Sequence, residues 1–208
     1  MDFAGELESH ITVDLPPWQP IESLMNWAGE RGLKCLHIVL DRGLQASQPM
    51  LSRRQRGTLA AELTSVNQIR QQLEAAGFHV SRIKIEAAPE NIGVPRSDAE
   101  AAQQPKERYF EHHVKLLLKE GVSLSALGAL AEGHSAHLSR NALHERAGGR
   151  QERFVTQRSW RVGRATAQVR LAALVAALEA QQYEIAAIEE EYVVYDSNLT
   201  VDAGWIKP

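Results

Sequence analysis

Two histidines occur in nearly the same sequence context. His10 lies in LESHITV and His113 lies in FEHHVKL, and both segments read apolar residue, Glu, any residue, His, β-branched residue. Histidine exchanges protons near neutral pH and is a common metal ligand. We therefore treat His10 and His113 as candidate catalytic residues. The alternative is that each is a structural histidine bonded to a neighbouring glutamate.

Other polar residues recur at a nearly constant separation along the chain. The matched pairs are His37 with His137, Ser52 with Thr156, Arg54 with Arg158, and Glu86 with Glu191. A shared fold requires apolar residues to match, but it does not require these polar ones. Arginine binds carboxylate and phosphate through paired hydrogen bonds, so the set predicts a site for a small anionic ligand. The alternative for the arginines is an ion pair with Glu86 or Glu191.

The segments that carry these residues follow the order β-α-β-β-α-β twice. Polar and apolar residues alternate over 7–15, as in a half-buried strand, and residues 58–77 have helical apolar spacing that ends at a glycine. Similar patterns recur over 109–118 and 165–182. This order is the ferredoxin-like motif. We predict an α+β protein formed by internal duplication of two ferredoxin-like units, each an antiparallel sheet with its helices on one face.

The predicted units are separated by a stretch without apolar periodicity. We expect a first unit over 1–88, a linker over 89–106, and a second unit with a C-terminal extension over 107–208. Each sheet leaves one face uncovered by helices. The two units could pack sheet on sheet, pair as a barrel around a central cleft, or form one continuous eight-stranded sheet.

Strand side chains alternate between the two faces of a sheet, so sequence parity predicts direction. Ile11 and Val13 should meet the helices, which directs His10 to the uncovered face, and Val114 and Leu116 do the same for His113. The remaining matched residues should share that face: His37, His137, Ser52, Arg54, Thr156, Arg158, Glu86 and Glu191. This direction requires a β-bulge near Ser81 in the strand that contains Glu86.

Two family resemblances rest on these motifs. HITV resembles the His-x-Thr-x signature of two-histidine phosphoesterases, which would make His10 and His113 an acid and a base, although the second copy reads HVKL. His10, Glu86, His113 and Glu191 also look like the metal ligands on the first and last strands of vicinal-oxygen-chelate enzymes. Modules of that second family carry one helix, whereas each half here is expected to carry two.

Three function classes follow from this reading. The first is an enzyme or binding protein for a small anion held between the halves. The second is a divalent-metal enzyme with histidine and glutamate ligands. The third is a noncatalytic protein that associates through its sheets, as a homo-oligomer for example. The sequence does not identify a cofactor.

Composition and net charge limit the classes of binding partner that we expect for this protein. The net charge is -3 and the isoelectric point is about 6.2, without the basic surface that nucleic-acid binding usually needs. We therefore expect no nucleic-acid partner. No apolar run has the length of a membrane span, so we expect no membrane partner either. A single cysteine, Cys35, fits a reducing environment and predicts a cytoplasmic protein.

Overall fold

The computed structural model describes residues 3–144 and 150–206. The segment HERAGGRQ at 144–151 is predicted from its sequence to be a hairpin loop, and most of it lies outside the described residues. The first half contains β1 (Ala4–Asp14), α1 (Ile21–Gly29), β2 (Lys34–Leu40), β3 (Ser47–Thr58), α2 (Leu59–Ala75) and β4 (His79–Ala87). After α3 (Asp98–Ala101) come β5 (Tyr109–Leu118), α4 (Leu124–Gly133), β6 (Ala136–Asn141), β7 (Gln151–Trp160), α5 (Arg164–Ala180), β8 (Glu184–Asp196) and the 3-10 helix η1 (Leu199–Asp202).

Local sequence explains where the long helix of the first half begins and ends. The hydroxyl of Thr58 accepts a hydrogen bond from the backbone N–H of Ala61 and caps the start of α2. Gly77, with a φ of 84°, follows the end of α2 in the left-handed conformation that glycine adopts readily. None of the helices in the described part of the chain has both the length and the apolar character that crossing a lipid bilayer requires.

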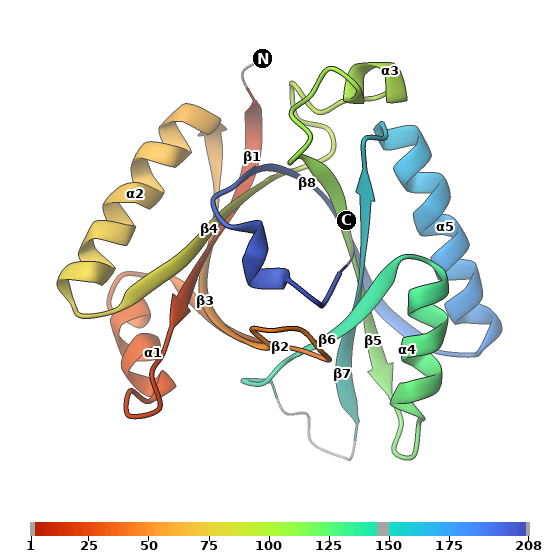
Figure 1. The fold of residues 1–208 in the computed structure, drawn as a ribbon, viewed down its shortest axis with the longest axis horizontal. Helices are drawn as coiled ribbons and strands as arrows, with labels where there is room; N and C mark the ends of the chain where they lie inside the picture. The colour runs from red at the N-terminus through yellow and green to blue at the C-terminus, as the bar shows by residue number, and fades with distance from the viewer. Residues whose placement is uncertain (1–2, 145–149, 207–208) are drawn as a thin grey trace.

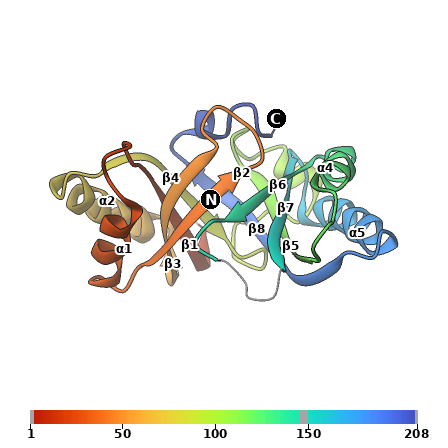
Figure 2. The same ribbon diagram turned by 90° about the horizontal axis from the view of Figure 1, so that it is seen from below.

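The eight strands form one closed antiparallel barrel in the order β1-β3-β2-β6-β7-β5-β8-β4 (Figure 1). Each half contributes four neighbouring strands, and the barrel closes where β2 pairs with β6 and β4 pairs with β8. Of the three arrangements expected from the sequence, pairing around a central space is the one observed. The structure is thus α+β, with the helices outside the barrel on two sides (Figure 2).

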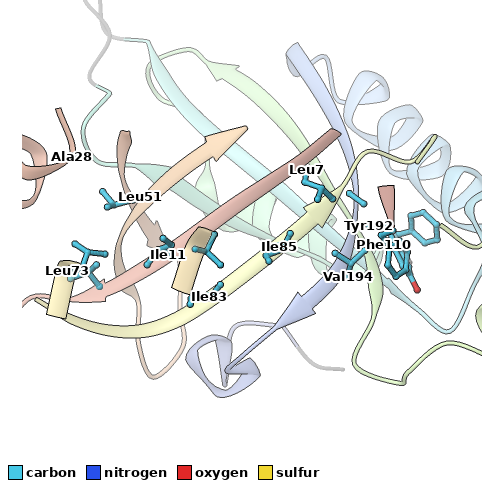
Figure 3. Close-up of a cluster of buried hydrophobic side chains, with 14 of the residues drawn as sticks. Leu7, Ile11, Ala28, Leu51, Leu73, Ile83, Ile85, Phe110, Tyr192 and Val194 are labelled. Carbon is cyan, nitrogen blue, oxygen red and sulfur yellow. The ribbon is translucent and has the colours of Figure 1, made fainter. Parts of the chain in front are cut away.

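Apolar residues fill the layers between strands and helices. One cluster joins α1 and α2 to the outer face of the first four strands and extends to Phe110 and Tyr192 (Figure 3). A second cluster does the same for α4 and α5, with Val114, Leu116 and Leu174 fully buried. Because these residues face outward, the alternate positions of the same strands face the barrel interior. The expected bulge is present, since Thr12 pairs with Arg82 whereas Val13 pairs with Val80.

The segment after β4 is ordered against the second half. It was predicted to be a linker because it lacks apolar periodicity, and it contains α3, which begins with a capping box between Ser97 and Glu100. The carboxylate of Asp98 accepts a hydrogen bond of 2.8 Å from the backbone N–H of Gly163. A Cβ on Gly163 would lie 2.3 Å from the backbone of Ser97, so only glycine allows this close approach.

The C-terminal segment lies across one end of the barrel, in front of the ring of strands in Figure 1 and at the upper edge of the molecule in Figure 2. Asp202 accepts hydrogen bonds from Arg82 at 2.9 Å and Arg158 at 2.6 Å, and both arginines come from strands of the barrel. The indole N–H of Trp205 donates to the carbonyl of Leu138 at 3.0 Å. These bonds attach η1 and the residues after it to both halves of the barrel.

The seam between β2 and β6 should be sensitive to loss of one side chain. It contains three residue pairs, and the buried side-chain oxygen of Asn141 accepts from the backbone N–H groups of His37 and Leu143, each at 3.1 Å. Asn141→Ala leaves both donors without this acceptor and should lower the free energy of unfolding by about 1–3 kcal/mol. Urea unfolding measures this loss. The control Gln68→Ala, at an exposed position on α2, should change stability by less than about 0.5 kcal/mol.

A buried histidine on the helix side of β5 predicts a pH dependence. His112 exposes 1% of its surface, and burial lowers the pKa of its imidazole. The unfolded chain, with a pKa of about 6.5, takes up a proton that the folded protein resists, so folded stability falls as the pH drops below that value. His112→Phe should lose less stability than the wild type from about pH 7.5 to about pH 5.5. Urea unfolding at both pH values measures the loss of stability. An equal loss in His112→Phe and in the wild type would contradict this assignment.

Candidate ligand-binding site in the barrel interior

The barrel encloses a cavity of about 640 Å³. Its wall is formed by inward-facing positions on the strands and by the C-terminal segment. Of the residues predicted to form a site, those that line it are His10, Ser52, Arg54, His113, Thr156, Arg158 and Glu191. Glu86 lines a second, smaller pocket of about 180 Å³ that shares Glu8, Arg54, Glu189 and Glu191 with the first. Both histidines of the repeated motif therefore face one space.

Strand register brings equivalent residues of the two halves into equivalent positions. In the first half His10 lies opposite Ser52, and Glu8 lies opposite Arg54. The same pairs occur in the second half. His113 lies opposite Thr156, and Glu111 lies opposite Arg158. The last strands complete the match, with Glu86 beside Glu8 and Glu191 beside Glu111.

The predicted direction of His37 is wrong. Its neighbours Leu36, Ile38 and Leu40 line the cavity, whereas His37 lies on the opposite face, with its Nε2 2.8 Å from the hydroxyl of Ser47. The prediction assumed that the apolar face of β2 meets the helices. This strand instead gives its apolar face to the barrel interior.

His137 is not the structural equivalent of His37. It pairs with Thr156, and the residue that pairs with the equivalent Ser52 is Lys34. His137 is buried at the C-terminal segment, where its Nδ1 contacts the Arg42 guanidinium and its ring lies 6.3 Å from that of Trp205. It is outside the residues that line the cavity, and the sequence match was out of register by three positions.

Both arginines of the predicted anion site are paired with carboxylates. Arg54 is bonded to Glu8, and Arg158 is bonded to Glu111 and Asp202. The alternative of an arginine–carboxylate pair is thus observed, but with partners other than the expected Glu86 and Glu191. The sequence indicated the inward direction of Glu8 and Glu111 without marking them as site residues.

Lys84 connects the two halves and was not predicted as a site residue. Its Nζ lies 2.7 Å from Glu86 and 2.5 Å from Glu111. Burial raises the pKa of Glu86, but Lys84 and His10 outweigh this effect and hold that pKa at about 2. His10 Nε2 lies 2.8 Å from the same carboxylate. Glu86 is therefore ionised at neutral pH and contacts one permanent cation, Lys84, and one imidazole.

The environment of Glu191 is different. Its carboxylate lies 3.6 Å from His113 Nε2, which is too long for a normal hydrogen bond. Burial raises the pKa of Glu191 well above its usual range, and the negative charges of Glu86 and Glu8 raise it further. The barrel interior thus contains a buried acid that is not compensated in the way that Glu86 is.

Three of the four residues considered as metal ligands lie together. Ligand atoms of Glu86, His113 and Glu191 are all within 4.8 Å of one another. His10 contacts Glu86 but is not part of this group. The Nδ1 of His113 is 2.9 Å from the hydroxyl of Thr156, which fixes the ring and leaves Nε2 facing the carboxylates.

An apolar wall lies in the same cavity as these charged groups. It includes Leu36, Ile38, Met50, Phe154 and Trp205. The adjacent Lys34 is exposed and forms no ion pair with any other residue that the structure describes. The cavity therefore combines apolar surface, an available cation and a layer of carboxylates and histidines.

No family model matches this sequence, and no curated protein matches it. Among solved structures, the acetolactate synthase small subunit from Thermotoga maritima aligns over 93% of this chain and 96% of its own, with 13% identity and a TM-score of 0.32. Chlorite dismutase from Candidatus Nitrospira defluvii in complex with imidazole aligns over 92% of each chain, with 15% identity and a TM-score of 0.28. A putative chlorite dismutase gives 11% identity and a TM-score of 0.28, over 95% of this chain and 97% of its own. Likenesses at this level carry no functional argument.

Removal of the cation from the buried ion pairs should lower the free energy of unfolding more than its removal from the exposed ion pair. Arg158→Met leaves the buried carboxylates of Glu111 and Asp202 without this partner and should cost about 3–5 kcal/mol. Arg54→Met is the matched control, since the Arg54 side chain is 53% exposed, and it should cost no more than about 1 kcal/mol. Urea unfolding of both variants provides the comparison. Equal losses would show that burial does not determine the effect of these pairs.

Proposed function

We propose that the barrel interior binds a small organic molecule that has an apolar body and a negatively charged group. The apolar body lies against Leu36, Ile38, Met50 and Phe154, and the negative group pairs with Lys34. The cavity of about 640 Å³ carries this proposal, because its volume is in the range of small-molecule sites and its wall is partly apolar.

The charge distribution favours Lys34 over the arginines as the partner of an anion. Arg54 and Arg158 already neutralise carboxylates, so an incoming anion would have to displace those groups. Lys34 has no such partner among the described residues, and it lies two positions from Leu36 on the same strand. An anionic group at Lys34 would therefore place an attached apolar body beside the apolar wall.

Acid–base catalysis by His10 and His113 is a second candidate function. Both imidazoles line the cavity, and each lies near carboxylates, at 2.8 Å from Glu86 for His10 and 3.5 Å from Glu111 for His113. A histidine oriented by a carboxylate is a frequent general base. Its test is to incubate any ligand found by screening with wild type and with His10→Gln, and to assay both for conversion. Conversion at equal rates in both would exclude His10.

A purely structural role for the polar residues is less well supported. In that reading the ion pairs fill the interior and the sheets serve for association. An open cavity of several hundred Å³ argues against a filled interior. Each of the eight strands also has a neighbour on both sides, so a homo-oligomer would have to form through the outer helices or loops.

We also propose that the two halves, with boundaries near 88 and 107, arose by duplication. The same order of strands and helices occurs twice, and the cross-strand pairs Glu8–Arg54 and Glu111–Arg158 occupy equivalent positions. Two copies of one binding face, turned toward each other, would produce a single cavity with contributions from both halves. Ligand binding in the cavity would then depend on residues of both units.

Binding of anilinonaphthalene sulfonate tests the proposed site, because this fluorescent probe has an apolar body and one negative group. We expect saturable binding at one site. Ile38→Trp and Ala187→Trp, which add bulk inside the cavity, should abolish it. Lys34→Met should weaken it by roughly fivefold, as expected for loss of an ion pair of about 1 kcal/mol.

The control is Val169→Trp, which adds the same side chain at an exposed position on α5. It should bind the probe as the wild type does. Probe binding that survives both cavity-filling substitutions in folded protein would place the probe elsewhere and contradict the proposal.

A further inference from the structure

We infer that Glu86, His113 and Glu191 bind a divalent transition-metal ion at the boundary between the two halves of the barrel. The residues come from β4, β5 and β8, and their ligand atoms lie within 4.8 Å of one another. Zinc binds nitrogen and oxygen ligands at about 2.0–2.2 Å in tetrahedral geometry, so its ligand atoms lie about 3.3–3.6 Å from one another. Side-chain movements of about 1 Å would bring the three groups to these separations.

The surrounding residues orient these ligands as outer-shell groups do in metal sites. The hydroxyl of Thr156 holds His113 Nδ1 at 2.9 Å, and this contact directs Nε2 toward the carboxylates. His10 contacts one oxygen of Glu86 and Lys84 contacts the other. Each carboxylate oxygen has more than one acceptor position, so Glu86 can keep these partners while it binds an ion. Such second contacts are typical of protein metal ligands.

Charge gives an independent reason for a cation at this place. Four buried or half-buried carboxylates meet here, Glu8, Glu86, Glu111 and Glu191, and three permanent cations neutralise them, Arg54, Lys84 and Arg158. Glu191 exposes 9% of its surface, and the one basic group within ion-pair distance of it among the described residues is the His113 imidazole at 3.6 Å. Burying a carboxylate without a partner is unfavourable, and a metal ion held with Glu86 would supply that partner.

An acidic entrance leads to the same residues. The second pocket, of about 180 Å³, is lined by Glu6, Glu8, Glu86, Glu189, Glu190 and Glu191, with Arg54 as its cationic residue. A cleft lined mainly by one sign of charge raises the local concentration of counterions. Cations would therefore be attracted to the end of the barrel where Glu86 and Glu191 lie.

The donor set indicates the class of metal. Imidazole favours zinc, iron, nickel and copper, whereas calcium and magnesium prefer oxygen alone. One imidazole with two carboxylates therefore favours a first-row transition metal. Zinc should bind more tightly than manganese at the same ligands. This inference goes beyond the proposed small-molecule site and does not depend on it, since the apolar wall and Lys34 are not among the ligands.

Titration of chelator-treated full-length protein with zinc chloride and with manganese chloride, followed by calorimetry, tests the inference. We expect one ion per chain, with zinc bound more tightly. Glu191→Gln and His113→Gln should weaken zinc binding by about tenfold or more, since even outer-shell changes alter metal affinity by about 10- to 100-fold. Zinc at 100 times its dissociation constant should shift the folding equilibrium of the wild type by about 100-fold.

Glu189→Gln is the matched control. Glu189 lies two positions from Glu191 on β8 and lines both pockets, but it is not one of the three ligands. Its affinity for zinc should stay within a few-fold of the wild type. No zinc binding, or equal binding by all four proteins, would overturn the inference.

The same variants separate this inference from the proposed function. Ile38→Trp, which fills the small-molecule cavity and leaves the three ligands unchanged, should bind zinc as the wild type does while its binding of anilinonaphthalene sulfonate is lost. Loss of probe binding in the cavity-filling variants together with unchanged zinc binding in Glu191→Gln would support the small-molecule site and remove the metal site. Stable folding of Glu191→Gln without zinc is expected, because the substitution removes a buried charge and retains the shape of the side chain.

Discussion

Barrel closure is the constraint on which the other features depend. When the two four-stranded halves pair at both seams, one face of every strand is turned into a common interior. The polar residues buried deepest on that face are removed from bulk water, so each buried charge needs a partner nearby. Arg158 illustrates the result, since it comes from β7 and is bonded to Glu111 on β5 and to Asp202 in the C-terminal segment.

Ion pairs of this kind attach the C-terminal segment to the strands of the barrel. Asp202 contacts Arg82 from the first half and Arg158 from the second, so one carboxylate neutralises a cation of each half. Gln48 donates a further hydrogen bond of 3.0 Å to Asp202. The segment that follows the last strand is therefore part of the charged interior, and it limits the cavity at that side.

Sequence parity predicted the inward-facing residues where a strand had one polar and one apolar face. Ile11 and Val13 face the helices, and His10 faces the cavity, as this alternation indicates. The rule failed on β2, because Leu36 and Ile38 form an apolar wall inside the barrel while His37 lies outside. A strand that is apolar toward the cavity cannot be distinguished by composition from one that is apolar toward a helix.

The closure of the barrel could not be predicted from the sequence either. The seam between β2 and β6 has three residue pairs, and the expected units are equally compatible with packed or continuous sheets. The short helix α3 was missed because four residues give no apolar periodicity, and only the capping pair Ser97 and Glu100 indicated its start. Long-range pairing, which no local pattern encodes, determines the closure of the barrel.

The two halves differ at a pair of corresponding positions that affects the charge of the interior. His10 lies opposite Lys84, whereas His113 lies opposite Glu189, so the two histidines have neighbours of opposite charge. Lys84 also compensates Glu86 and Glu111, one from each half, which leaves Glu191 as the carboxylate with the weakest compensation. The carboxylate of Glu189, at the position that corresponds to Lys84, adds negative charge around His113 and Glu191, and this asymmetry distinguishes that region from the rest of the cavity.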